Sequence, residues 1–129
     1  MQFVLGDAYR LPVSSRRFDG AFAGFWFSHV PIASVGEFLH GLHRALVPGS
    51  KVVLLDNRFV ESSSTAISER DADGNSYQLR KLADGSTHRV LKNFPSKREL
   101  HQAVHGVAKE VRHHEWQYFW ALEYVVGEP

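Results

Sequence analysis

The segment FWFSHVP, from Phe25 to Pro31, places three aromatic rings, a serine and a histidine directly before a proline. A buried strand accounts for the rings, but it has no need of the neighbouring Ser28 and His29 side chains. A surface loop, in turn, has no need of so much ring area. Because an imidazole exchanges protons near neutral pH, His29 is the residue of this segment with acid–base chemistry to offer. The segment is therefore a candidate site.

The other histidines raise the question of a metal site. Two pairs have helical spacing, His101 with His105 and His40 with His43, while His113 is followed by another histidine in a predicted strand. Neighbouring side chains of a strand point to opposite faces. Zinc needs three or four convergent ligands, and none of these groups supplies them by itself. We therefore expect surface histidines and no metal.

Composition narrows the class of protein. A chain of 129 residues with 43% hydrophobic content is long enough for one domain with a core. Its 15 basic and 14 acidic residues leave a net charge of +1, which favours neither nucleic acid nor an anionic membrane as a partner. The sequence has no cysteine, no apolar run of the roughly 20 residues that span a bilayer, and no visible signal peptide. We expect a cytoplasmic protein.

The first half of the chain predicts a βαβ unit. QFVL (residues 2–5) is typical of a short buried strand, and the apolar run over residues 18–27 indicates a central parallel strand covered on both faces. A helix then follows a capping box at Ser34 and ends at Pro48-Gly49. A second buried strand covers residues 51–56, and the crossover between the two long strands should be right-handed.

The second half begins with a polar insertion over residues 57–95. Within it, YQLRKL (77–82) and THRVLK (87–92) flank the turn dipeptide Asp84-Gly85, which predicts a β-hairpin. The predicted elements that close the chain are a helix opened by the capping box of Ser96 and Glu99, and two antiparallel strands over residues 106–117 and 118–126.

Four motifs follow one another with family-like gaps: GDAYRLP, FDGAF, FSHVP and LHRALVPGSKVVLLD. In this order the chain resembles the C-terminal portion of class I S-adenosylmethionine-dependent methyltransferases, in the branch with small-molecule acceptors. The resemblance implies an α/β fold with an incomplete Rossmann-like sheet. Parallel strands would be joined by a helix crossover, the terminal strands would be antiparallel, and a β-hairpin would be inserted. Residues 1–129 would form the C-terminal part of one methyltransferase domain, with 57–95 as the insertion.

One family feature is missing from the chain. The glycine-rich loop of the family should precede Gly6-Asp7, and no G-x-G occurs anywhere in the sequence. That loop brings backbone N–H groups against the cofactor at the switch point of the sheet. We therefore expect a fragment that is inactive by itself. The alternative is a non-catalytic binding or dimerisation module derived from the same fold.

The resemblance also assigns the cofactor, S-adenosylmethionine, to particular residues. Asp7 would accept a hydrogen bond from the adenine amino group, and the Ala8 N–H would face a ring nitrogen. The alternative for Asp7 is an Asx-turn that closes the strand. Phe25 would lie beside the methionine portion of the cofactor, with plain hydrophobic packing as the alternative.

On the acceptor side, the resemblance implies that His29 faces the transferring methyl group and takes a proton from the attacking atom. Loop packing is the alternative, because an in-line displacement depends more on positioning than on proton removal. The substrate-binding candidates are Trp26, Asn57 and Arg58. The guanidinium of Arg58 suits a carboxylate or phosphate, although a solvated loop explains it equally well. The hairpin insertion would either cover the acceptor pocket or pair with a second subunit in a homodimer.

Overall fold

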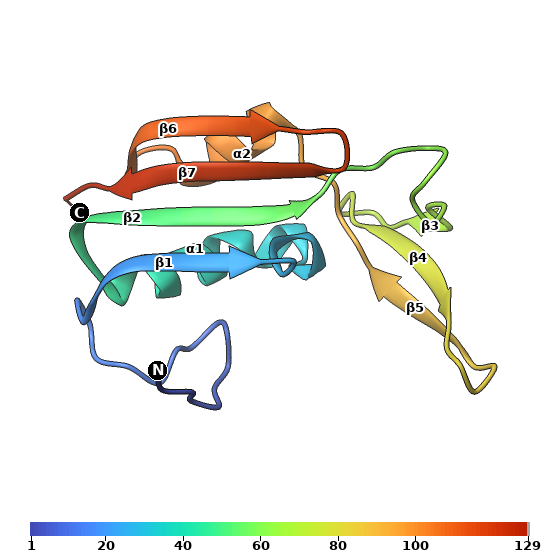
Figure 1. The fold of residues 1–129 in the computed structure, drawn as a ribbon, viewed down its shortest axis with the longest axis horizontal. Helices are drawn as coiled ribbons and strands as arrows, with labels where there is room; N and C mark the ends of the chain where they lie inside the picture. Colours follow the sequence, from blue (N-terminus) through green and yellow to red (C-terminus); the bar gives the residue numbers. More distant parts are fainter. Residues whose placement is uncertain (129) are drawn as a thin grey trace.

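The computed structural model describes residues 1–128, and its centre is a four-stranded sheet (Figure 1). The strands run in the order β1 (Phe18–Gly24), β2 (Leu46–Asn57), β7 (Phe119–Val126) and β6 (Ala108–Glu115). β1 and β2 are parallel, whereas β7 is antiparallel to both β2 and β6. The predicted mixed α/β sheet with antiparallel closing strands is therefore confirmed.

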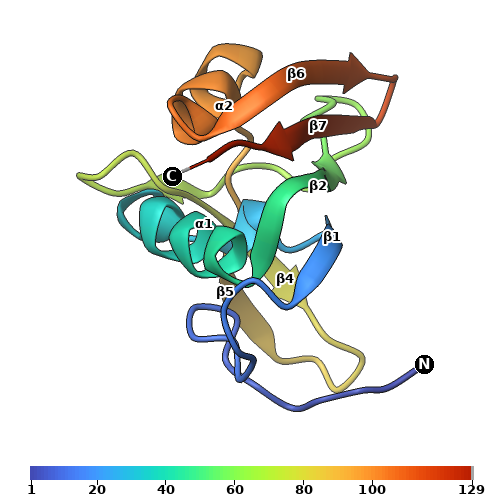
Figure 2. The same cartoon turned by 90° about the vertical axis from the view of Figure 1, so that its left-hand side faces the viewer.

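Two helices cover one face of this sheet (Figure 2). α1 (Val35–Arg44) joins β1 to β2, and α2 (Lys97–Val104) precedes β6. Side chains alternate along a strand, so every second residue of β2 and β7 faces the helices. The buried residues contributed to the core by these four elements include Phe38, Leu39, Val52, Leu54, Leu100, Val104, Leu122 and Tyr124.

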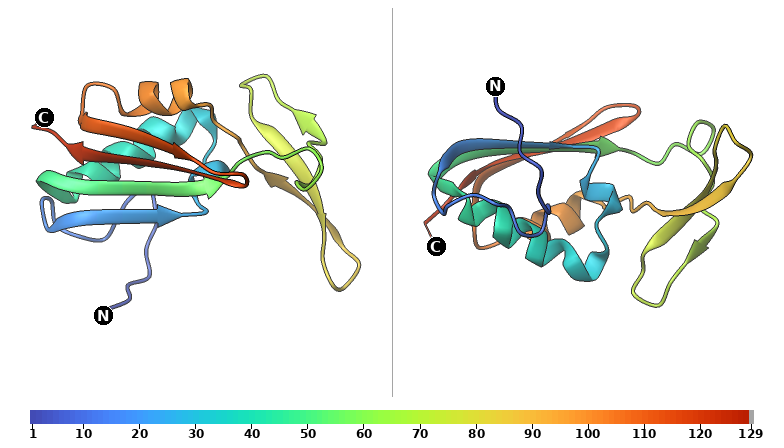
Figure 3. Two further views of the ribbon diagram at one scale, coloured as in Figure 1. Left: turned by 45° about the horizontal axis from the view of Figure 1, so that its top comes forward. Right: turned by 90° about the horizontal axis from the view of Figure 1, so that it is seen from below.

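The other face of the sheet carries no helix in the part of the chain that is described (Figure 3). Phe22 points to this face and is 66% exposed, whereas Ala21 and Ala23 pack against the core. The expectation of a central strand over residues 18–27, covered on both faces, is wrong in three respects, the first being this exposed face. The strand ends at Gly24, and it lies at the edge of the sheet because β2 is its only neighbour in the described chain.

The QFVL strand is also absent. Residues 1–6 have no regular secondary structure, and Phe3 and Leu5 are 88% and 99% exposed. An extended segment becomes a strand only when a neighbouring strand pairs with its backbone groups. The segment passes below the sheet without pairing to it (Figure 1), so its apolar pattern alone does not produce a strand.

The two predicted capping boxes have different outcomes. At α2, Ser96 Oγ accepts from Glu99 N at 3.1 Å and Glu99 Oε1 accepts from Ser96 N at 2.9 Å, which confirms the prediction. At α1 the helix is present, but the side chain of Ser34 makes no capping bond. Ser34 belongs to a preceding 3₁₀ turn, η2 (Ile32–Ser34), so its backbone is already helical and does not have the extended conformation of a capping residue.

The segment predicted as an insertion contains a second sheet, which projects from one end of the main sheet (Figure 1). This sheet, with Lys92 directly after its last strand, is here called the arm (residues 69–92). Its strands are β3 (Glu69–Arg70), β4 (Ser76–Lys81) and β5 (Thr87–Leu91). The predicted hairpin between β4 and β5 is confirmed. At its tip, Gly85 has a φ of +89°, a conformation that glycine adopts without steric cost.

Candidate functional site

The two parallel strands end at the same edge of the sheet, and this is where open α/β sheets bind ligands. Gly24 is the last residue of β1 and pairs with Leu55, so Phe25 and the end of β2 at Asn57 lie close together. The Phe25 N–H donates to the Leu55 carbonyl at 2.8 Å. The chain between Phe25 and Val30, here called the rim segment, therefore starts at the ligand-binding edge of the fold.

Phe25 has an unusual backbone conformation. Its φ of +59° lies in the left-handed region, which costs a residue with a Cβ about 1–2 kcal/mol. Phe25 is 49% exposed, and its ring meets Phe119 of β7 edge-on, with the ring centroids 6.1 Å apart. Strained residues of this kind occur preferentially at functional sites, where they aim the following chain. Here the strain turns the rim segment out of the sheet.

Asp56, the penultimate residue of β2, is hydrogen-bonded to the rim segment. Its Oδ2 accepts from the Ser28 N–H at 2.9 Å, and its Oδ1 accepts from the Asn57 N–H at 2.8 Å. Asp56 and Ser28 are both 0% exposed. A carboxylate sealed from water needs compensating donors, and two backbone N–H groups supply part of that need.

A buried lysine supplies the remaining donor to the Asp56 carboxylate. Lys92, directly after β5, donates from Nζ to Ser28 Oγ at 2.8 Å, to Asp56 Oδ1 at 3.1 Å and to Asn57 Oδ1 at 3.0 Å. An ammonium has three donors, and all three are used. This explains the serine of the rim segment, whose hydroxyl accepts from a cation on the arm. Sequence reasoning missed Lys92, because its partners lie 64, 36 and 35 positions away.

His29 is bonded to the same part of the arm. Its Nδ1 lies 2.8 Å from the Leu91 carbonyl oxygen. A carbonyl oxygen can only accept, so Nδ1 carries a hydrogen, and in the neutral ring Nε2 then keeps its lone pair. Nε2 has no hydrogen-bond partner within residues 1–128. The loop-packing role and the proton-acceptor role are thus compatible, since they use different ring nitrogens.

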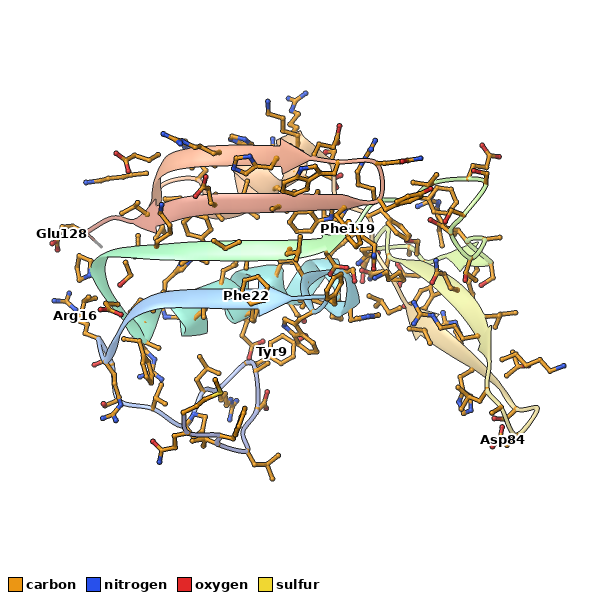
Figure 4. The ribbon with its side chains drawn as sticks, viewed as in Figure 1. Tyr9, Arg16, Phe22, Asp84, Phe119 and Glu128 are labelled. Carbon is orange, nitrogen blue, oxygen red and sulfur yellow. The ribbon has the colours of Figure 1, made fainter. Side chains whose placement is uncertain are left out.

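Asp7 and Ala8 belong to a short turn next to the rim segment. Asp7 Oδ1 accepts from the Tyr9 N–H at 2.8 Å, which is the Asx-turn of the alternative interpretation. The Tyr9 ring meets Trp26 edge-on at 6.0 Å and points from this turn toward the end of β1 (Figure 4). Burial, followed by the charges of Glu37 and Asp7, raises the pKa of Tyr9.

The three predicted substrate residues have different surroundings. Asn57 belongs to the Lys92 network, and Trp26 packs toward α1, with its ring 6.2 Å from that of Phe38. Trp26 Nε1 is buried and has no partner among the described residues. Arg58 is already engaged, since its Nη1 donates to the Trp116 carbonyl at 2.6 Å. Its guanidinium secures the turn between β6 and β7, and an incoming anion would have to displace that bond.

Two cavities lie on the helical side of the sheet. One, of about 480 Å³, lies between α1, α2 and the arm, and its lining includes Phe27 and Val30 of the rim segment. The other, of about 390 Å³, is lined by His40 and His43 of α1 among others. Neither is lined by the predicted cofactor or substrate residues.

Within residues 1–128, none of the helices has the length and apolar content of a membrane span. No group of three metal-ligating side chains converges among these residues either.

The fold and the rim segment define an α/β protein with a candidate site at the carboxyl ends of its parallel strands. Residues 1–54 match a family described as a methyltransferase domain. A stretch of 56 residues is 43% identical to 2-phytyl-1,4-naphtoquinone methyltransferase of Synechocystis sp., which corresponds to 43% of this chain and 23% of that protein.

Solved structures extend the likeness to nearly the whole chain. A complex of DhpI with SAH matches with a TM-score of 0.73 and 22% identity, over 99% of this chain and 56% of DhpI. A SAM-dependent methyltransferase from Methanosarcina mazei matches with a TM-score of 0.68 and 15% identity, over 98% of this chain and 68% of that one. The chain thus spans about half the length of DhpI, and its matched stretch covers about a quarter of the Synechocystis protein. The resemblance to class I methyltransferases is confirmed, in the fold and in the first 54 residues.

Proposed function

We propose that this chain provides the acceptor side of an S-adenosylmethionine-dependent methyltransferase that acts on a small molecule. The observation that carries this proposal is the rim segment. It leaves the sheet through the strained Phe25 and presents His29 with a free Nε2 at the carboxyl ends of the parallel strands. The methyltransferase-domain match over residues 1–54 and the SAH in the DhpI complex support the cofactor.

The residues fit this chemistry in the following way. When bound, S-adenosylmethionine supplies an electrophilic methyl group on a sulfonium. Asp7 and Ala8 would face its adenine, and the half-exposed ring of Phe25 would lie against its methionine portion. An acceptor's lone pair would gain that methyl group, and the carbon–sulfur bonding electrons would remain on sulfur. His29 Nε2 takes the proton that an oxygen or nitrogen acceptor releases.

Trp26, Asn57 and Arg58 would surround the acceptor. Asn57 is held by Lys92, so its position is fixed before any acceptor arrives. Trp26 keeps a buried donor, Nε1, without a partner in the described chain. Pre-positioned groups lower the entropic barrier of a displacement reaction, and this contributes more to methyl transfer than proton removal does.

We further propose that the active enzyme needs additional polypeptide, with residues 57–95 as an insertion in the completed domain. The support is the face of the sheet that residues 1–128 leave uncovered, where Phe22 is 66% exposed, and the edge of β1 that no strand among them pairs with. Sheets with parallel strands are normally covered on both faces. The cysteine-free sequence supports a reducing compartment such as the cytoplasm.

Calorimetric titration with S-adenosylhomocysteine tests both proposals. We expect no measurable heat of binding with the chain by itself, and micromolar binding once it is fused to the portion of DhpI that it does not match. Binding by the chain alone would contradict the need for more polypeptide and leave the methyltransferase assignment standing. A folded fusion that binds nothing would contradict the methyltransferase assignment.

A second candidate function is a dimerisation module that uses the arm. The observation that favours it is the exposure of two leucines on the arm, Leu79 (52%) and Leu82 (51%). Sedimentation equilibrium over a range of concentrations tests it. If the arm joins two copies, the double variant L79S/L82S will be monomeric at concentrations where the unaltered chain is dimeric. A monomeric unaltered chain contradicts it.

A further inference from the structure

The last residue of β5 and the two residues after it, Leu91–Asn93, each form hydrogen bonds with the rim segment. We call these three residues the clamp. The Leu91 carbonyl accepts from His29 Nδ1 at 2.8 Å. The Asn93 N–H donates to the Ser28 carbonyl at 2.7 Å, and Asn93 Nδ2 donates to the Val30 carbonyl at 3.3 Å. Each residue from 28 to 30 is therefore held by the clamp.

The middle residue of the clamp makes the strongest link. Lys92 is 5% exposed and forms an ion pair with Asp56, which is 0% exposed and belongs to β2. Hydrogen bonds between ionised groups are shorter and stronger than neutral ones. The buried Lys92–Asp56 pair therefore connects the clamp to the main sheet. Ser28 forms hydrogen bonds with both members of the pair.

This arrangement determines which nitrogen of His29 carries the hydrogen. With the clamp in place, an unprotonated Nδ1 would face the Leu91 carbonyl oxygen at 2.8 Å, lone pair against lone pair. The Nδ1–H tautomer replaces that repulsion by a hydrogen bond, as second-sphere carbonyls do for other functional histidines. If the clamp moved away, this constraint on the tautomer would be lost.

We propose that Lys92 is a positioning residue, which locks the clamp against the rim segment and so keeps His29 Nε2 free to accept a proton. The use of that free nitrogen in methyl transfer rests on the proposed function. The tautomer itself does not, since it follows from contacts within the chain. Lys92 acts through Leu91 and His29 and has no assigned contact with either substrate.

The test is ¹⁵N NMR of the His29 ring in the whole chain at about pH 8, where imidazoles are neutral. We expect a single Nδ1–H tautomer in the unaltered chain. In D56N/K92M, which removes the buried charges together, we expect both tautomers to appear. S28A keeps the ion pair and removes one link of the clamp, so it should fold even if the double variant does not, and should show a smaller share of the second tautomer.

K51M serves as the matched control. It removes a lysine that pairs with Glu123 on the exposed side of the sheet, and it should leave the His29 signal unchanged. An Nε2–H tautomer in the unaltered chain would overturn the proposal, and so would a single unchanged tautomer in the folded variants. The readout needs no cofactor. It can therefore fail while S-adenosylhomocysteine still binds the fusion with the unmatched portion of DhpI, and the reverse holds as well.

Discussion

The ammonium of Lys92 lies 3.1 Å from the carboxylate of Asp56, and both side chains are sealed from solvent. The two residues come from different parts of the fold, since Lys92 follows β5 of the arm and Asp56 belongs to β2 of the main sheet. This pair is the link between the arm and the edge at which parallel strands bind ligands. The position of the rim segment therefore depends on the arm.

Breaking this pair should be costly. We expect K92M to lower the free energy of unfolding by roughly 3–5 kcal/mol, because it leaves the Asp56 charge buried without its partner. D56N/K92M should recover much of that loss, since no uncompensated charge remains. Urea denaturation followed by circular dichroism measures both.

The same lysine-to-methionine change at Lys51 is the control. Lys51 pairs with Glu123 at 3.6 Å, but the side chain of Lys51 is 65% exposed. Exposed pairs of this kind contribute roughly 0–1 kcal/mol. If K51M and K92M cost the same, the buried pair has no special role in stability.

Phe25 can be tested by comparing two truncations. F25A and F25G both remove the ring contact with Phe119, but only glycine is free of the steric cost at a φ of +59°. We expect F25G to be more stable than F25A by about 1 kcal/mol, again by urea denaturation. An alanine variant as stable as the glycine variant would mean that the left-handed conformation is not present in solution.

Gly41 explains how the Asp7–Arg10 turn approaches α1. A Cβ at Gly41 would lie 3.1 Å from the Tyr9 carbonyl oxygen, whereas a Cβ at Gly36 of the same helix would meet nothing within 4 Å. Alanine is favoured over glycine in a helix by about 1 kcal/mol. G36A should therefore gain close to that amount, and G41A should gain less or lose stability. Equal gains would show that the turn does not pack on α1.

Stability should decrease in mild acid because of His43. This histidine is half-buried, and its Nε2 lies 2.6 Å from the hydroxyl of Tyr124. Burial, followed by the neighbouring His40, lowers the pKa of His43. The unfolded chain therefore binds more protons below about pH 6.5, and the free energy of unfolding falls as the pH drops through that value.

Denaturant titrations between about pH 5 and pH 8 check this slope. H43Q removes the titrating group and keeps a polar partner for Tyr124, so its slope should be shallower. It should not vanish, because burial also lowers the pKa of His113. An unchanged slope in H43Q would assign the effect elsewhere. The half-buried position of His43 also corrects the expectation that the histidines are surface residues.

Local sequence signals predicted several elements correctly. The β1–α1–β2 unit, the β4–β5 hairpin and the two closing strands are confirmed. Each depends on apolar periodicity or on turn and capping residues within about ten positions, which are local properties. The same signals failed for QFVL and for the face of β1. Whether an apolar segment is a strand, and whether a strand is covered, depends on neighbours elsewhere in the chain.

Taken alone, the sequence determined the methyltransferase-like order of elements and singled out His29 as the residue with proton chemistry, because motifs and residue types are written along the chain. Only the tertiary structure decided what surrounds that histidine. Lys92 looked like one more charge on an amphipathic strand, and its three partners lie 35 to 64 positions away. A buried ion pair forms only when folding brings two distant segments together, so no local sequence pattern predicts it.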